Sequence, residues 1–182
     1  LLGRPTQDRV TTLAAGLDGA IRRIETAYDV RGQIERLSSC TSATVGSGSV
    51  ANEVRFAYND FRQAIQTWQA HAGAVDTMTT PKVETTYADG STNTIRPTEM
   101  VYPNGRTVTY DYGTASGLND QLSRVASFID DDTTSLAAFA YLGLGSLVEQ
   151  TSPEADLQYT LVNPAGTNDP ATGDIYSGLD RF

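Results

Sequence analysis

The sequence predicts an all-β protein made of tandem β-hairpins, and three observations support this fold class. Apolar and polar residues alternate in short runs, which is the two-residue period of a half-buried strand. Asx-Gly pairs, the strongest short signal of a hairpin turn, lie between these runs. Seven of the nine tyrosines end such a run, most often just before a turn-forming residue: Tyr28, Tyr58, Tyr87, Tyr110, Tyr141, Tyr159 and Tyr176.

The spacing of these tyrosines predicts a repeat protein. The first five are 30, 29, 23 and 31 residues apart, which is close to the period of known stacked-repeat architectures. A hairpin of this length cannot bury its apolar face alone, so each unit needs the next one beside it. We therefore expect a single array over residues 1–182, with about six units that each contain a strand, a tyrosine-led turn, a return strand and a longer connection.

Alternation before the tyrosines predicts the first strand of each unit, with apolar side chains on one face and polar side chains on the other. These strands are expected at Ile24–Tyr28, Val54–Tyr58, Val108–Tyr110, Phe139–Tyr141 and Leu157–Tyr159. Return strands are expected at 33–37 and 63–68, directly after two of the turns.

Tight turns are expected at three Asx-Gly pairs, because both residue types tolerate positive φ: Asp18-Gly19, Asp89-Gly90 and Asn104-Gly105. The clearest hairpin is 100–110, where two strands flank Asn104-Gly105. Segments 38–49 and 163–173 are rich in glycine, serine, threonine, asparagine and proline, and predict longer connections.

Two segments also match the spacing of a helix. They contain Leu118, Leu122, Val125 and Ile129 in one case, and Val10, Leu13, Leu17 and Ile21 in the other. We expect strands in both, because Asp18-Gly19 favours a hairpin in the earlier segment and the later one occupies the place of a return strand.

The segment Tyr28-Asp29-Val30-Arg31-Gly32-Gln33-Ile34 resembles the tyrosine-aspartate (YD) repeat of the Rhs family, which reads approximately Tyr-Asp-x-x-Gly-Arg-Leu. Tyr110-Asp111-Tyr112-Gly113, preceded by the turn at Asn104-Gly105, is similar to it. Tyr58-Asn59 begins a degenerate copy in which Arg62 replaces the glycine. The remaining copies depart further: Tyr87-Ala88-Asp89-Gly90, Tyr141, Tyr176, and Tyr159, which retains only the strand.

The resemblance implies a continuous, spirally wound sheet that forms part of a larger shell and continues beyond both termini. In this family the shell encloses or displays cargo in bacterial surface or secreted proteins, polymorphic toxins among them, and the repeats catalyse no reaction. The expected partners are neighbouring repeats, an enclosed cargo domain or surface glycans, and the expected location is extracellular or at the cell surface.

The physical properties of the tyrosine-aspartate pair also favour a structural role. A tyrosine at a strand end can pack its ring between hairpins while its hydroxyl reaches a backbone group. An aspartate beside it can accept backbone N–H groups and so cap the turn.

Composition excludes several classes of protein. The chain has 13 basic and 22 acidic residues and a net charge of −9, so it repels phosphate backbones and nucleic acid is not an expected partner. It contains no apolar run of the ~20 residues that span a bilayer. Cys40 is the only cysteine, which rules out an internal disulfide.

Candidate catalytic and metal-binding residues are few, and we expect no enzyme activity, cofactor or metal. His71 is the only histidine and is expected in an exposed loop. Asp130-Asp131-Asp132 offers oxygen ligands for calcium, but an acidic turn between two strands is the simpler interpretation. Paired carboxylates of a glycoside hydrolase or lyase are a further alternative, for which Glu149, Glu154 and Asp156 lie near one loop.

A carbohydrate-binding β-module is the main alternative function. Trp68, with Tyr58 and Phe61, could form an aromatic platform for a sugar. A role in the core or between repeats is the competing interpretation, because such side chains are usually buried.

Overall fold

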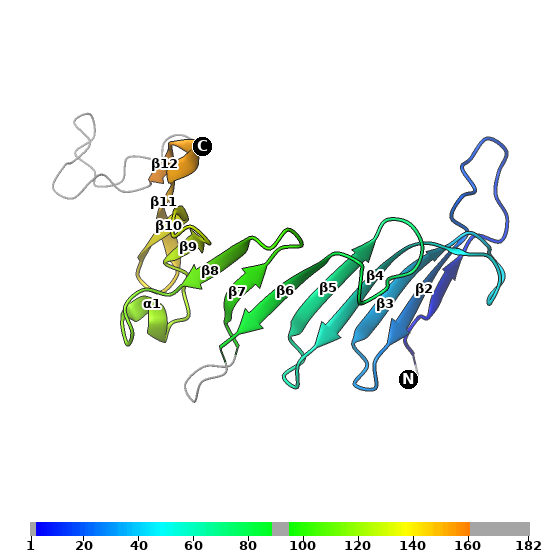
Figure 1. The fold of residues 1–182 in the computed structure, drawn as a ribbon, viewed down its shortest axis with the longest axis horizontal. Coiled ribbons are helices and arrows are strands. Elements are labelled where there is room, and N and C mark those ends of the chain that lie inside the picture. Colours follow the sequence, from blue (N-terminus) through cyan, green and yellow to red (C-terminus); the bar gives the residue numbers. More distant parts are fainter. Residues whose placement is uncertain (1–2, 89–94, 161–182) are drawn as a thin grey trace. The chain divides into compact units, whose positions relative to one another are not determined.

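The computed structural model describes residues 3–88 and 95–160 (Figure 1). The described residues form 12 strands in one open sheet, whose order is the chain order from β1 to β12. The pairings defined between neighbouring strands are antiparallel. The predicted all-β hairpin array is therefore confirmed at the level of its architecture.

The first six strands are β1 (Gln7–Arg9), β2 (Arg23–Tyr28), β3 (Ile34–Cys40), β4 (Val50–Tyr58), β5 (Ala64–Ala70) and β6 (Lys82–Tyr87). The later elements are β7 (Pro97–Val101), β8 (Thr107–Asp111), the helix α1 (Leu118–Gln121), β9 (Ser127–Asp130), β10 (Ser135–Leu142), β11 (Ser146–Ser152), the 3-10 helix η1 (Pro153–Ala155) and β12 (Leu157–Thr160).

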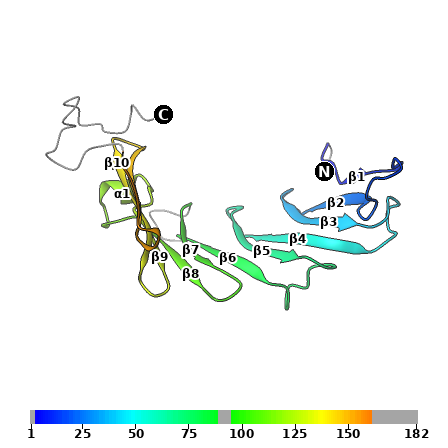
Figure 2. The same ribbon diagram turned by 90° about the horizontal axis from the view of Figure 1, so that it is seen from above.

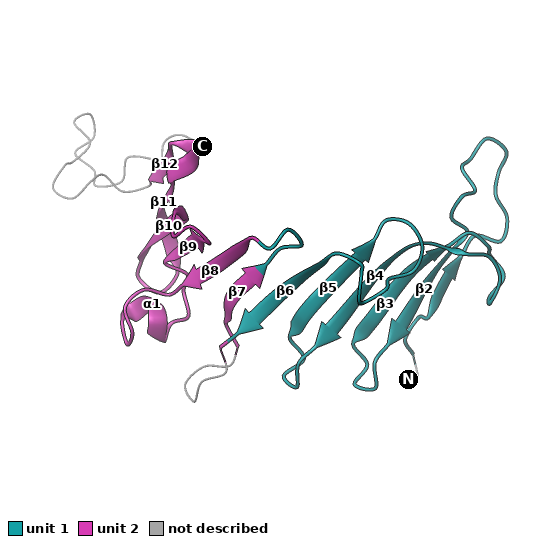
Figure 3. Ribbon diagram, viewed as in Figure 1, with its two compact units in different colours: residues 1–87, 101–105 teal, residues 88–100, 106–182 magenta. Residues whose placement is uncertain are grey.

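The chain divides into two compact units (Figure 3). Unit 1 contains residues 1–87 and 101–105, and unit 2 contains residues 88–100 and 106–182. In unit 1 the strands lie side by side in one layer (Figure 2). The tight turns after β2 and β4 are at one edge of this layer, and the longer connections 41–49 and 71–81 are at the other (Figure 1).

The most buried side chains of unit 1 lie on one face of its sheet. Directly opposed residues of antiparallel strands share a face, and the register pairs Arg23 with Cys40, and Glu53 with both Ser38 and Ala70. All five are less than 9% exposed. This is the polar face, whereas Val54 and Phe56 on the opposite face are only half-buried.

The alternation correctly predicted which residues share a face, but the apolar face is not the better covered one. The core of unit 1 forms on the polar face because the long connections fold over that face and contact its charged residues.

The structure corrects three expectations about the connections. Residues 38–40 belong to β3, so the connection predicted at 38–49 covers 41–49. The segment 10–22 contains neither strand nor helix and joins β1 to β2. Leu118–Gln121 is helical, because residues 112–126 form a long connection in which Gln121 and Leu122 donate to the carbonyls four residues earlier.

The tyrosine-terminated strands and both return strands are present where the sequence predicted them. The hairpin predicted at 100–110 corresponds to β7 and β8, which are neighbours in the sheet. Its turn contains Gly105, which has a φ of 86° and donates its N–H to the Tyr102 carbonyl at 2.9 Å. Asp89, Gly90, Tyr176 and the predicted connection 163–173 lie outside the described residues.

Candidate functional site

Tyrosine side chains join neighbouring strands of the sheet. Their hydroxyls donate to backbone carbonyls at or just before the start of the preceding strand, a contact that we call the tyrosine joint. In unit 1 the joints are Tyr28 to Pro5 at 2.8 Å, Tyr58 to Ile34 at 2.7 Å and Tyr87 to Ala64 at 3.1 Å. In unit 2 they are Tyr112 to Pro97 and Tyr141 to Val125, both at 2.8 Å.

Three of the joints coincide with a β-bulge. The strand register shifts between Ala27 and Tyr28, between Ala57 and Tyr58, and between Ala140 and Tyr141. In each case the return strand contains one extra residue, because the partner changes by two positions where the tyrosine strand advances by one. A bulge re-aims the side chains beside it, and this one recurs between the tyrosine and the residue before it.

The residue after the tyrosine caps the turn, as expected. Asp29 accepts the N–H groups of Arg31 and Gln33 on Oδ1, at 2.9 and 2.7 Å. Asn59 makes the same pair of bonds in the next turn, both at 3.0 Å. Asparagine replaces aspartate without loss here because both present the same carbonyl-like oxygen.

The degenerate copy of the repeat keeps the backbone of the well-formed copy. Gly32 has a φ of 79°, and Arg62 at the equivalent position has a φ of 66°. Both residues donate an N–H to the carbonyl of the capping residue, at 2.9 and 3.1 Å respectively. The loss of glycine therefore leaves the turn type unchanged.

The third predicted copy has a different arrangement. At Tyr110-Asp111-Tyr112 the joint to Pro97 is made by Tyr112, which sequence reasoning did not single out. The ring of Tyr110 packs edge-on against Phe128, with 5.0 Å between ring centroids. Asp111 accepts the N–H of Gly113 at 2.9 Å. The recurrence of Arg-Pro-Thr at 4–6 and 96–98, each containing a joint acceptor, is a signal that could have identified Tyr112.

Burial changes the chemistry of two joint tyrosines. Desolvation, followed by the negative charge of Asp29, raises the pKa of Tyr58. Burial likewise raises the pKa of Tyr112, against the opposing effect of Arg96. Both hydroxyls therefore stay protonated and remain hydrogen-bond donors well above neutral pH.

A cavity of about 360 Å³ in unit 1 is the candidate ligand site. Its lining includes two arginines, two carboxylates and three large aromatic residues: Arg31, Arg55, Asp29, Glu35, Phe56, Tyr58 and Trp68. Each charge already has a partner. Arg31 pairs with Asp60 at 2.6 Å and Arg55 with Glu35 at 2.9 Å, while Asp29 caps its own turn.

Trp68 lines this cavity and is only 5% exposed. An exposed platform for stacking a sugar is therefore absent at its ring. Its indole N–H is buried and has no hydrogen-bond partner among the described residues. Phe61, which the sequence grouped with it, is 65% exposed in the turn after β4.

Two buried charges hold the long connections against the polar face of unit 1. Arg23, 4% exposed, donates to the carbonyls of Ser42 and Thr44 in the connection 41–49. Glu53, also 4% exposed, accepts the N–H of Val75 in the connection 71–81 at 3.1 Å. Each lies five residues before a joint tyrosine, so the repeat includes a position that anchors a connection.

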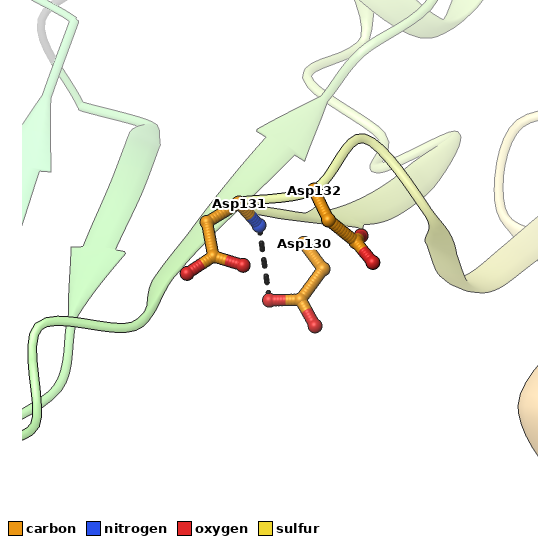
Figure 4. A group of neighbouring side chains, drawn as sticks. All are labelled: Asp130, Asp131 and Asp132. Carbon is orange, nitrogen blue, oxygen red and sulfur yellow. Dashed lines mark hydrogen bonds between the residues drawn. The ribbon is translucent and has the colours of Figure 1, made fainter.

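The three consecutive aspartates form the turn between β9 and β10 (Figure 4). One oxygen from each lies within 4.8 Å of the others. However, Asp130 makes a bidentate ion pair with Arg106, whose Nη2 is 2.6 Å from Oδ2, and Asp132 accepts the N–H of Thr134 at 2.8 Å. The ion pair with Arg106 lowers the pKa of Asp130, and the side chain and then the N–H of Thr134 lower the pKa of Asp132. These contacts give the cluster a role as an acidic turn.

The remaining predicted residues lie in different elements of the fold. His71 is exposed in the connection after β5. Glu154 and Asp156 are exposed in and beside η1, and Glu149 is in β11, where Oε1 accepts a hydrogen bond from Gln158 at 2.8 Å. Tyr159 lies in β12 and is 39% exposed.

No protein-family model matches this sequence, and no curated protein matches it. Among the described residues, no helix has the length and apolar character needed to cross a membrane.

Proposed function

We propose that this chain is a non-catalytic structural segment of an Rhs-like YD-repeat protein, in which it builds part of the wall of a β-shell that encloses or displays cargo at or outside the cell surface. The observation that carries the proposal is the tyrosine joint. Five tyrosines in two units donate to the same place on the preceding strand. A contact that repeats with the hairpins serves the array, since a catalytic residue occurs once.

The energetics agree with a scaffold. A neutral intramolecular hydrogen bond contributes about 0.5–1.5 kcal/mol, so no single joint determines the fold. In a repeat array the total stability is approximately a sum over units and interfaces. Repetition of a modest contact is therefore an effective way to extend a single-layer sheet.

The test replaces Tyr58 with phenylalanine, which keeps the ring and removes the hydroxyl. We expect Tyr58→Phe to destabilise the chain by about 0.5–1.5 kcal/mol in urea unfolding. Tyr102→Phe is the matched control, because this hydroxyl makes no hydrogen bond in the described part of the chain and the side chain is 40% exposed. Equal stabilities for the two variants would refute the structural role of the joint.

The shell requires a separate test. Electron microscopy of the chain together with its flanking sequence should show a hollow particle, and the flanks should contain further tyrosine-aspartate units. Solid particles, or flanks without such units, would refute the shell and leave the joint intact.

A second candidate function is the binding of a small polar ligand such as a sugar, and the cavity beside Trp68 favours it. Its volume lies within the range of ligand pockets. Two carboxylates line it, but Asp29 caps a turn and Glu35 pairs with Arg55, so we propose binding without turnover. Glycan-array binding that is reduced in Arg55→Ala would support this function, and the absence of binding to any glycan would refute it.

A further inference from the structure

The residue just before each joint acceptor is always an arginine or a glutamine. The acceptor carbonyls belong to Pro5, Ile34, Ala64, Pro97 and Val125. The residues that precede them are Arg4, Gln33, Gln63, Arg96 and Arg124. Both residue types have a long side chain that ends in N–H donors. We call this place in the repeat the clasp position.

At three clasp positions an arginine covers the ring of the tyrosine bound by the next carbonyl. The guanidinium carbon is 5.3 Å from the ring centroid at Tyr28, 4.3 Å at Tyr112 and 4.7 Å at Tyr141. All three distances are within the range of a cation–π contact. The tyrosine is therefore held twice by two consecutive residues, at its ring and at its hydroxyl.

Two of these arginines, Arg96 and Arg124, also reach the connection that follows the tyrosine. Arg96 donates to the Asp120 carbonyl at 2.9 Å and pairs with its carboxylate at 2.6 Å. Arg124 donates to the carbonyl of Gly143 at 2.6 Å. The guanidinium thus links the preceding hairpin to both the ring and the turn of the next.

The glutamine at position 33 reproduces only part of this contact. Its Nε2 donates to the Arg62 carbonyl in the next turn at 2.9 Å. Glutamine carries no charge, so it forms no cation–π contact with Tyr58. Its Oε1 is buried and has no hydrogen-bond partner among the described residues, which is an unfavourable state that an arginine, having no acceptor, avoids.

We propose that the clasp position determines how strongly one hairpin binds the next, with strong joints at arginine and weak joints at glutamine. The inference rests on the proposed structural function and extends it. The partner that the clasp recognises is a hairpin whose strand ends in tyrosine and whose following turn presents a carbonyl or carboxylate oxygen. In unit 1 the joint of Tyr58 has Gln33 at its clasp position, so it is a point at which neighbouring hairpins separate first.

The main test converts a weak joint into a strong one. In Gln33→Arg, we expect amide hydrogen exchange in the turn 59–63 to slow by about two- to fivefold, which corresponds to the energy of one exposed cation–π contact. Gln33→Met is the matched control, because it removes the unpartnered oxygen, together with the Nε2 hydrogen bond to the Arg62 carbonyl, at similar length without adding a charge. A change of the same size in both variants would overturn the proposal.

A second pair of variants tests dependence on the ring. The gain from Gln33→Arg should vanish when Tyr58 is replaced by leucine, because the cation then has no aromatic face. In the opposite direction, Arg124→Gln should speed exchange in the turn 143–145 by about two- to fivefold. If Gln33→Arg still slowed exchange beside leucine at position 58, or if Arg124→Gln left exchange in the turn 143–145 unchanged, the clasp proposal would be overturned.

These outcomes are distinguishable from failure of the structural function. If Tyr58→Phe lowers the stability in urea while Gln33→Arg leaves hydrogen exchange unchanged, the structural role of the joint is supported and the clasp proposal is wrong. If neither change has an effect, the proposed function fails together with the clasp.

Discussion

Arg62 is one of the positions at which the second copy of the repeat departs from the best copy, and we expect its replacement by glycine to stabilise the protein. The residue has a φ of 66°, where a Cβ approaches the following carbonyl and costs roughly 1–2 kcal/mol. Its side chain is exposed and makes no hydrogen bond or ion pair in the described part of the chain. Its carbonyl, which accepts from Gln33 at 2.9 Å, is retained in the variant.

The expected magnitude follows from two opposing effects. Relief of the left-handed conformation contributes roughly 1–2 kcal/mol, and the greater freedom of glycine in the unfolded chain offsets about 0.4–1 kcal/mol of this. The net stabilisation of Arg62→Gly is therefore about 0.5–1 kcal/mol. For a chain of this size such a gain raises Tm by about 1–4 °C.

Urea unfolding followed by circular dichroism measures the change, and the slope m should stay constant while the midpoint rises. Arg62→Ala is the control, because it removes the side chain and retains the Cβ. The reverse change, Gly32→Ala, should destabilise, since Gly32 has the same left-handed backbone conformation and the added methyl group would displace the guanidinium of Arg4. If Arg62→Gly were no more stable than Arg62→Ala, the backbone argument would be refuted.

Three further predictions concern other contacts. Arg106 lowers the pKa of Asp130. The ion pair therefore stabilises the fold above the unfolded pKa of about 4, and this stabilisation is lost as the pH falls through the lower pKa of the folded state. Between about pH 5 and pH 2, thermal unfolding should show a smaller loss of Tm in Asp130→Asn than in the parent. Trp68→Ala should lower stability by about 3–5 kcal/mol in urea because it empties a buried site, whereas Trp68→Phe, which keeps one aromatic ring and loses the unpartnered N–H together with part of the ring volume, should cost less. Glu53→Ala should release the connection 71–81, which limited proteolysis would detect as faster cleavage near Val75; unchanged cleavage would contradict the anchoring role.

Features that depend on neighbouring residues in the chain could be predicted from the sequence. The alternation before Tyr58 determines the faces of β4, and the Asx residue after it forms the turn through bonds only two and four residues away. Both effects act within one hairpin, so periodicity and turn chemistry are sufficient to identify them.

Features that depend on how distant segments fold over one another could not be predicted. Glu53 alternates like an exposed strand residue, and only the return of the connection 71–81 buries it. The joint at Tyr112 was missed because two tyrosines flank Asp111, and the choice between them depends on the position of Pro97. The helix at 118–121 likewise reflects the length of its connection, since its apolar spacing was compatible with either structure.

The anchors of the two long connections have opposite charge, and this limits how the repeats can be recombined. Arg23 donates to carbonyl oxygens of the connection 41–49, whereas Glu53 accepts an N–H from the connection 71–81. A connection grafted from one hairpin onto the other would bring the wrong backbone group to a buried charge and remove its bond to the connection, leaving Arg23 only its pair with Glu25, and Glu53 its side-chain contacts with Ser38 and Arg36. Exchange of loops between repeats therefore requires exchange of the residue five positions before the tyrosine, and the two must be inherited together.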